Sequence, residues 1–212
     1  PPTAEDPSTP PAADAPTAIF LDDTLSDEKL MELGENTVLH KSVMDGRALS
    51  VASDVDGAQL DVASAAMSFD GTETRVENVE PYALFGDRSG DFMGALEMQP
   101  DFTHEIKIDY YDERQANGDL IYEDTDWLET DGNDKLSGRA DADDRFGIDA
   151  DKLGAVSIYG FRSGDSVADT GEGLIDLLAN GQKVGDDWVI DFGEGSRLTL
   201  LEYDAEDDPL LM

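Results

Sequence analysis

The stretch Glu129–Phe146 reads E-T-D-G-N-D-K-L-S-G-R-A-D-A-D-D-R-F and lies between two regions rich in short apolar segments. Within it, Asp131, Asn133 and Asp134 surround a glycine, and Leu136 follows two positions later. This order predicts a turn, where glycine permits a backbone geometry that a Cβ would hinder, and then a short strand with the leucine turned inward. Ca²⁺ takes carboxylate and carbonyl oxygens as ligands, about six to eight of them. The stretch is therefore a candidate calcium site.

The same residues resemble the RTX family, the glycine- and aspartate-rich nonapeptide repeats of proteins exported by type I secretion. Gly132, Asn133, Asp134 and Leu136 match the end of one G-G-x-G-x-D-x-U-x repeat, and Gly138 matches the start of the next. The match then degrades, because an arginine stands where a second glycine is expected. Stacked repeats need about three units to bury a continuous core, so this segment must lean on its neighbours.

The resemblance implies calcium as the cofactor, with folding driven by the higher calcium concentration outside the cell. The expected metal ligands are Asp131, Asn133, Asp134, Asp141 and Asp143. The alternative is an acidic, glycine-containing linker that binds nothing specifically.

Charge and composition narrow the class of partner. The 212 residues include 50 acidic and 14 basic side chains, which gives a formal net charge of −36. Such a charge argues against nucleic acid and anionic membranes and leaves cations as expected partners. Cysteine is absent, so no disulfide framework is possible. No apolar run approaches the ~20 residues that span a bilayer, so membrane insertion is not expected.

The chain divides by composition into three parts. Residues 1–17 hold most of the prolines and no basic residue, which predicts a linker or tail. Residues 18–128 contain short apolar runs separated by Asp-, Gly- and Asn-rich turns, which predicts an antiparallel β-sandwich. Only Ser26–Leu33, with a serine that could cap it, favours a helix. Residues 129–212 are predicted to form a second, calcium-binding and export domain.

A second resemblance rests on Arg75–Leu96, R-V-E-N-V-E-P-Y-A-L-F-G-D-R-S-G-D-F-M-G-A-L. The pattern E-N-V-x-P-Y-A-L-F-G-D-x-x-G-D-(F/Y) resembles Ig-like modules of secreted, often marine, bacterial proteins. Tyr82 and its apolar neighbours are expected to form a buried corner. Alternatively, Asp87 and Asp91, with Tyr82 and Phe92, form a ligand site or a second calcium loop at the tip of the sandwich.

The C-terminal region resembles the β-rich portion that follows RTX repeats in exported proteases. Its D-W-V-I-D-F-G-E-G-S-R-L-T-L run, residues 187–200, carries half of the matching positions, and the others lie between Asp144 and Leu177. The chain end D-A-E-D-D-P-L-L-M resembles the uncleaved signal of type I export substrates, and no N-terminal signal peptide is visible. The resemblance therefore implies a secreted protein, extracellular or on the cell surface.

The sequence contains no recognisable set of catalytic residues. The chain contains no G-x-S-x-G, H-E-x-x-H or phosphate-binding loop, and its two histidines, His40 and His104, are expected to be structural. Fifty carboxylates single out no pair for glycoside hydrolysis. We therefore expect that the chain is not an enzyme.

The resulting prediction is an all-β chain, an Ig-like antiparallel β-sandwich followed by a short RTX-type β-roll or β-sandwich domain. Its expected function is that of a secreted, calcium-binding adhesive or accessory module. A second hypothesis is a carbohydrate-binding module of a larger polysaccharide-active enzyme. The residues to inspect for it are Tyr82, Phe85, Asp87, Asp91, Phe92, Tyr110 and Tyr111. A third is a structural subunit that contacts other copies of itself through exposed strand edges.

Overall fold

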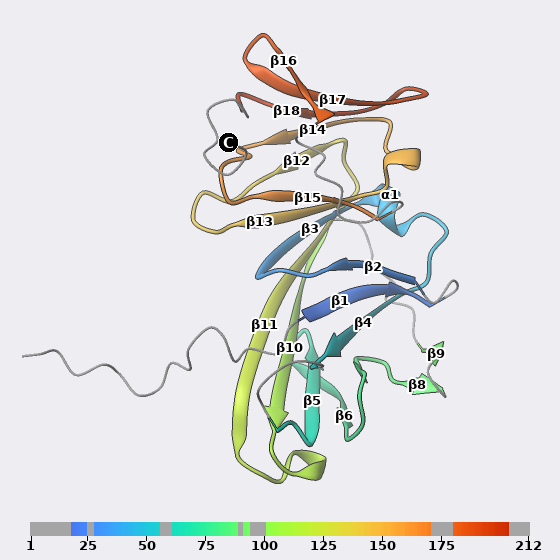
Figure 1. The fold of residues 1–212 in the computed structure, drawn as a ribbon, viewed down its shortest axis with the longest axis vertical. Helices are drawn as coiled ribbons and strands as arrows, with labels where there is room; N and C mark the ends of the chain where they lie inside the picture. Colours follow the sequence, from blue (N-terminus) through green and yellow to red (C-terminus); the bar gives the residue numbers. More distant parts are fainter. Residues whose placement is uncertain are drawn as a thin grey trace, which may run out of the picture.

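The computed structural model describes residues 18–24, 28–55, 61–88, 91–93, 101–170 and 180–203. The predicted linker at residues 1–17 and the acidic chain end at residues 204–212 lie outside these ranges. The described part is mostly β-structure, which confirms the all-β prediction (Figure 1). Within it, no helix has both the length and the apolar character needed to cross a membrane.

A four-stranded antiparallel sheet forms one layer of the N-terminal half. Its strands, in spatial order, are β2 (Glu28–Glu32), β1 (Ala18–Asp23), β4 (Leu49–Asp54) and β7 (Tyr82–Ala83). Of the segment Ser26–Leu33, which favoured a helix in the sequence, residues 28–32 form strand β2. Leu30 and Met31 of this strand are buried, and pairing with β1 satisfies its backbone.

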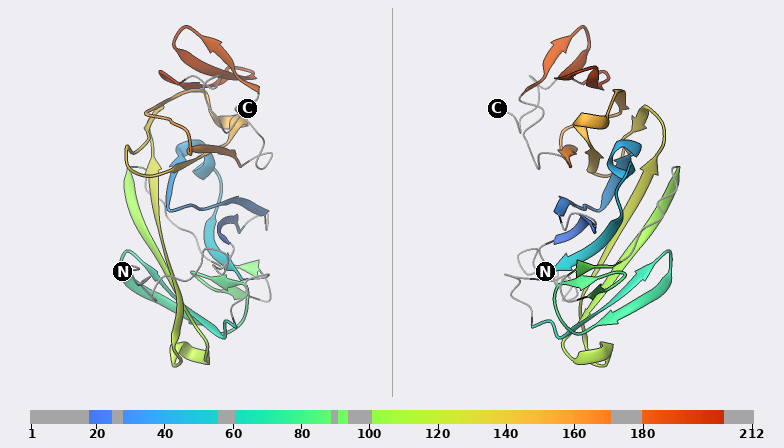
Figure 2. Two further views of the ribbon diagram at one scale, coloured as in Figure 1. Left: turned by 60° about the vertical axis from the view of Figure 1, so that its left-hand side comes forward. Right: turned by 90° about the vertical axis from the view of Figure 1, so that its right-hand side faces the viewer.

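A seven-stranded sheet faces this layer and also extends into the C-terminal half. Its order is β15 (Ser166–Asp169), β13 (Asp144–Ile148), β3 (Asn36–His40), β11 (Leu120–Asp131), β10 (Phe102–Tyr111), β5 (Ser64–Phe69) and β6 (Thr72–Glu77). In β10, Ile106, Ile108 and Tyr110 are buried, as their alternation predicted. Figure 2 shows β10 and β11 along one side of the sandwich and β1, β2 and β4 along the other.

Strand β3 departs from the expected antiparallel arrangement, because it pairs in parallel with β11 on one side and with β13 on the other. All five of its residues are buried. A strand buried on both faces is typical of parallel pairing. Val38 packs into the core of the C-terminal half and Leu39 into that of the N-terminal half, so β3 belongs to both.

A five-stranded sheet covers the C-terminal half. Its order is β12 (Lys135–Ser137), β14 (Ala155–Tyr159), β18 (Ser196–Leu200), β17 (Asp187–Gly193) and β16 (Gln182–Val184). The first three strands are parallel, and β16, β17 and β18 are antiparallel.

The four consecutive strands from β12 to β15 alternate between the five-stranded and the seven-stranded sheet. Within this run, β12 pairs in parallel with β14, and β13 pairs in parallel with β15. We call this segment, residues 135–169, the coil. Its interior contains Leu136, Phe146, Ile158 and Val167. The chain thus winds through two layers and encloses an apolar core between them (Figure 1).

The remaining elements are short. They are helix α1 (Lys41–Met44), the 3₁₀ turns η1 (Arg114–Ala116) and η2 (Ala150–Lys152), and the hairpin of β8 (Asp87–Arg88) and β9 (Asp91–Phe92). The division predicted between residues 128 and 129 falls inside β11, and the seven-stranded sheet is continuous across it.

Candidate functional site

Three of the predicted calcium ligands lie at the end of β11 and in the turn to β12, and two of them, Asp131 and Asn133, bind each other. Asp131 Oδ1 accepts hydrogen bonds from the backbone N of Asn133 at 2.7 Å and from its side-chain Nδ2 at 2.9 Å. Asp101 Oδ1 accepts from Asn133 Nδ2 at 3.2 Å and from the backbone N of Gly132 at 3.3 Å. Asp101 was not predicted, since it lies far away in the sequence and no local pattern marks it.

The third of these residues, Asp134, is engaged by a lysine. Lys41 Nζ lies 2.6 Å from Asp134 Oδ1, and this hydrogen bond holds the pKa of Asp134 below its usual range. His40 Nε2 lies 3.9 Å from the same oxygen. The ring of His40 is buried, and its Nδ1 accepts from the backbone N of Ser42, which caps helix α1. Burial, and then the charge of Lys41, lower the pKa of His40, which keeps this ring neutral.

The other two predicted ligands, Asp141 and Asp143, lie in residues 138–143, the connection from β12 to β13. Asp141 is exposed. Asp143 packs against Gly164, where an added Cβ would lie 2.5 Å from Asp143 Oδ1. The guanidinium of Arg162 donates to two backbone carbonyls of this connection, those of Ala140 and Ala142.

The structure does not bring the five predicted calcium ligands together at one point. The residues lie in two places, and amide, ammonium or guanidinium groups already donate to oxygens that an ion would use. In the described part of the chain, no group of three or more histidine and acidic residues is placed to hold a metal.

The second predicted site, Tyr82, Asp87, Asp91 and Phe92, lies around the tip of the sandwich. Its two aromatic side chains pack against the protein. Tyr82 is buried edge-to-face against Tyr110, with ring centroids 6.3 Å apart, and burial raises the pKa of Tyr82 to about 12. Phe92 packs on the small buried cluster of β4 and β7. In the backbone register of the β8–β9 hairpin, Asp87 lies opposite Phe92 and Arg88 lies opposite Asp91. The expected buried corner is confirmed for Tyr82.

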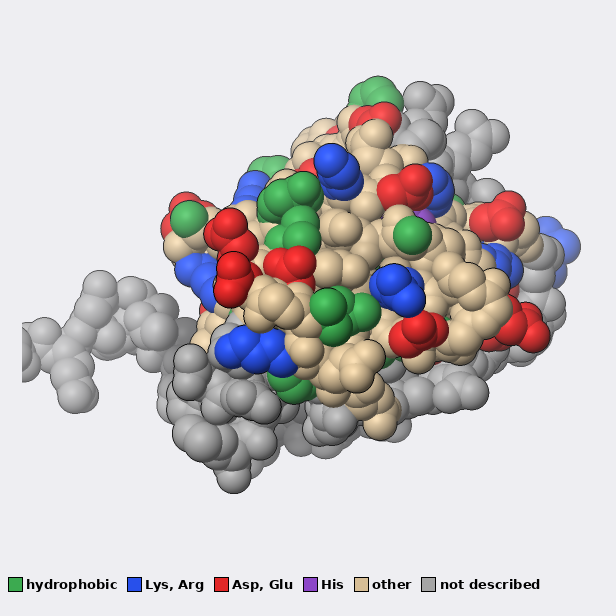
Figure 3. Space-filling view, turned by 90° about the horizontal axis from the view of Figure 1, so that it is seen from above, with side chains coloured by type: hydrophobic (Ala, Val, Ile, Leu, Met, Phe, Trp, Pro, Cys, Tyr) green, Lys and Arg blue, Asp and Glu red, His purple; other side chains and the backbone are tan. Residues whose placement is uncertain are grey.

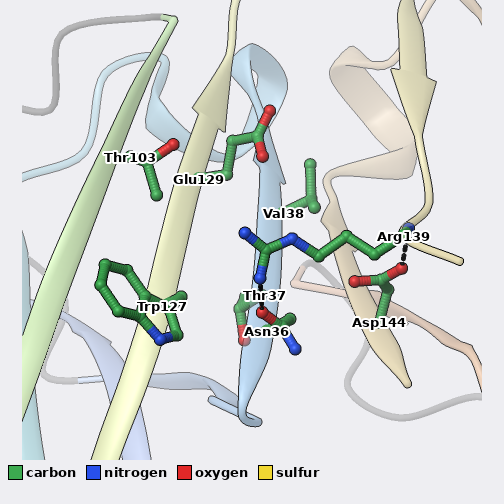
Figure 4. A pocket seen from close by; sticks show the side chains of 8 residues that line it. All are labelled: Asn36, Thr37, Val38, Thr103, Trp127, Glu129, Arg139 and Asp144. Carbon is green, nitrogen blue, oxygen red and sulfur yellow. Dashed lines mark hydrogen bonds between the residues drawn. The ribbon is translucent and has the colours of Figure 1, made fainter. Parts of the chain in front are cut away.

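A shallow hollow on the outer face of the seven-stranded sheet was not predicted. It has a volume of about 10 Å³, roughly the room for one water. It is lined by Asn36, Thr37, Val38, Thr103, Trp127, Glu129, Arg139 and Asp144. Figure 4 shows the guanidinium of Arg139 reaching over β3 to Asn36, to which it donates a hydrogen bond, with Trp127 and Glu129 on the neighbouring β11.

Trp127 is the prominent side chain of this hollow. Its indole is 38% exposed, although large aromatic side chains are usually more buried. In the sheet, Trp127 pairs with Glu105 of the neighbouring strand β10, and the next residue along β11, Leu128, is buried. Beside it, burial and then the nearby Asp131 charge raise the pKa of Glu129. The only sequence signal is that tryptophan takes the outward position in the alternation of β11.

Comparison with protein-family models, with curated proteins and with solved structures finds no match for this chain. The geometry alone therefore defines its class, that of an all-β protein in which one sheet takes part in two cores.

Proposed function

We propose that the chain is a non-catalytic, adhesive module of a secreted protein and that it binds a neutral extracellular polysaccharide through the outer face of the seven-stranded sheet. The observation that carries this proposal is the exposed indole of Trp127, held on a central strand. A rigid strand fixes the ring in place, so little conformational freedom is lost when a ligand stacks on it.

The groups around the indole match the chemistry of a sugar. A pyranose presents an apolar C–H face that stacks on an indole, and hydroxyls at its rim that donate and accept hydrogen bonds. Glu129 offers acceptors, Arg139 and Asn36 offer donors, and Thr103 offers both. The hollow is too small to enclose a sugar ring, so the ligand would lie across the strands as a surface-bound chain.

Charge favours a neutral polysaccharide over an acidic one. The formal net charge of −36 repels polyanions at long range. The face seen from above β16–β18 carries interspersed acidic and basic side chains and only small groups of apolar ones (Figure 3).

Secretion is supported by the agreement between the coil and the RTX resemblance. Three of its four strands have an aspartate two positions before their inward apolar residue. These pairs are Asp134 with Leu136, Asp144 with Phe146 and Asp165 with Val167. The same D-x-U order ends each repeat of that family. The two packed sheets of the N-terminal half similarly support the Ig-like assignment. We therefore include in the proposal an RTX-type export domain, an Ig-like sandwich and the absence of catalysis.

Cosedimentation with insoluble neutral polysaccharides, such as cellulose and chitin, tests the ligand. We expect Trp127→Ala to weaken binding at least ~10-fold, a loss of about 1.4 kcal/mol. Tyr159→Ala is the matched control, because Tyr159 is 44% exposed but lies on the five-stranded sheet. Equal binding by the wild type and Trp127→Ala, or no binding by either, would refute the proposal. Sedimentation velocity on the same samples tests self-association, the expected behaviour of a structural subunit.

A further inference from the structure

Two connections of the coil lie one above the other at the same end. Residues 138–143 join β12 to β13, and residues 160–165 join β14 to β15; we call them the stacked turns. They stack because β12 pairs with β14 and β13 with β15. The backbone N of Gly138 donates to Tyr159 O at 2.8 Å, and a Cβ on Gly138 would lie 2.9 Å from Gly160 O. Only glycine permits so close an approach.

One side chain bridges the two turns. Arg162 belongs to the second turn, and its guanidinium donates through Nη1 to Ala140 O and through Nη2 to Ala142 O in the first. Its Nε lies 3.8 Å from Asp165 Oδ1, within its own turn. The guanidinium therefore lies among carbonyl and carboxylate oxygens contributed by both turns.

The stacked turns also contain buried negative charge that needs compensation. Asp165 Oδ1 accepts from the backbone N of Asp144 at 2.9 Å, and its Oδ2 accepts from the backbone N of Arg162 at 2.9 Å. Asp144 accepts from the backbone N of Arg139 through Oδ2, while its buried Oδ1 has no hydrogen-bond partner among the described residues. Two buried carboxylates so close together repel each other unless a positive charge lies near them.

The RTX resemblance implies that a calcium ion between turns would compensate this charge. A calcium ion accepts electron pairs from oxygens, and a guanidinium donates five N–H groups to oxygens in one plane. Either group satisfies carbonyls that point into a turn. Arg162 already occupies two of these carbonyls, which leaves Asp144 Oδ1 as a free oxygen against the six to eight that calcium prefers.

We infer that Arg162 is a built-in cation that replaces calcium between the stacked turns, so that this part of the coil folds without a divalent metal. The inference concerns the coil alone and does not rest on the polysaccharide ligand. A chain with this feature keeps the strand order of a calcium-dependent coil and has lost its requirement for the ion.

Hydrogen exchange of the full chain tests this directly. We expect the amides of the stacked turns to show the same protection in EDTA, in millimolar CaCl₂ and in MgCl₂ at equal ionic strength. Calcium-specific protection of residues 138–144 or 160–165 in the wild type would overturn the inference. This readout is local, so calcium bound elsewhere on the acidic surface does not affect it.

Substitution of the arginine sharpens the test. Arg162→Ala should lower the melting temperature by about 5 °C, since it removes the charge and leaves two carbonyls without donors. In this variant calcium should raise the melting temperature more than magnesium does, because Ala140 O, Ala142 O and Asp144 Oδ1 become available together. Arg197→Ala is the matched control, because it removes the same charge from an exposed ion pair with Asp191. If Arg162→Ala melts like this control, the inference is wrong.

A conservative variant keeps the test decisive if Arg162→Ala does not fold. Arg162→Lys retains the charge and loses the planar fork, so it should fold and fall between the wild type and alanine in stability. A lysine variant as stable as the wild type, with unchanged exchange at residues 138–144, would show that simple charge suffices and that the bridging geometry contributes nothing.

Discussion

The coil and the sandwich both bury aspartates, but they stabilise them in different ways. In the coil, Asp149 contacts Arg47 Nη2 at 3.1 Å and Lys152 Nζ at 3.4 Å. Asp169 accepts from the backbone N of Ala150 at 3.2 Å. Asp165 accepts two backbone N–H groups. N–H donors or cations thus surround each of these carboxyls, and at Asp165, where burial raises the pKa, the two backbone donors oppose that rise.

In the sandwich, Asp126 of β11 is only 5% exposed, and burial raises its pKa to about 7. The charges of Asp124 and Glu35 raise it further, while Arg145 opposes them. Below about pH 7 the protonated, neutral carboxyl is therefore the favoured form here. The comparison teaches that the pKa of a buried aspartate depends on the donors around it as well as on burial.

The largest effect is expected where one cation serves two buried acids. Arg47 lies 3.1 Å from Asp149 and 3.7 Å from Asp23, and Nη1 donates to Thr170 Oγ1 at 3.0 Å. Arg47→Met should lower the free energy of unfolding by about 3 kcal/mol, since it removes the cation that two buried acids share. Urea denaturation at neutral pH measures this. Arg197→Ala, at an exposed ion pair, should cost less than about 1 kcal/mol, and equal losses would contradict the comparison.

A smaller effect of opposite sign is expected at Asp126. Its folded-state pKa lies above the unfolded value, so its contribution to stability is complete below about pH 4 and is lost as pH rises through about 7. Asp126→Asn should therefore match the wild type near pH 4 and be more stable by about 2 kcal/mol at pH 8.

Urea midpoints between pH 4 and pH 8 measure this difference. Asp141→Asn, at an exposed position, is the control and should show no comparable trend. A stability gain at Asp126→Asn that does not change with pH would show that loss of a carboxyl proton is not its cause.

The smallest effect concerns a neutral pair in the sandwich core. Ser53 Oγ and the Tyr110 hydroxyl lie 2.6 Å apart, and both side chains are fully buried. Tyr110→Phe should cost about 1–2 kcal/mol, because it leaves the serine hydroxyl buried without a partner. The double variant Tyr110→Phe with Ser53→Ala should recover part of this loss, as a double-mutant cycle measures. Additive losses would mean that the hydrogen bond contributes no coupling.

Local patterns predicted the strands well where one face is buried. The alternation of Ile106, Ile108 and Tyr110 indicated β10 and its inward face, and both were confirmed. Parallel pairing of β3 was missed, because it depends on two partners distant in the sequence. Helix α1 was also missed, since it is four residues long and is capped by His40 rather than by a typical capping residue.

In the candidate site, only contacts between residues close in the sequence could be predicted. The contact between Asp131 and Asn133 follows from their spacing, as in an Asx turn. Lys41, Asp101 and Arg162 were not predicted to meet these loops, because tertiary folding brings each of them there from outside the motif. The exposure of Trp127 depends likewise on which face of β11 stays uncovered, and the sequence leaves that open.

The position of β3 has a consequence for how the chain reaches its native state. This strand, from early in the sequence, lies between two strands that the chain forms much later, and its Val38 and Leu39 enter different cores. Contacts of such high sequence separation slow folding, because a long loop must close before they contribute. Neither core is complete until that closure occurs. If the chain were cut before β11, each fragment would lack part of its hydrophobic core. The two fragments would then associate by pairing β3 of the first with β11 and β13 of the second.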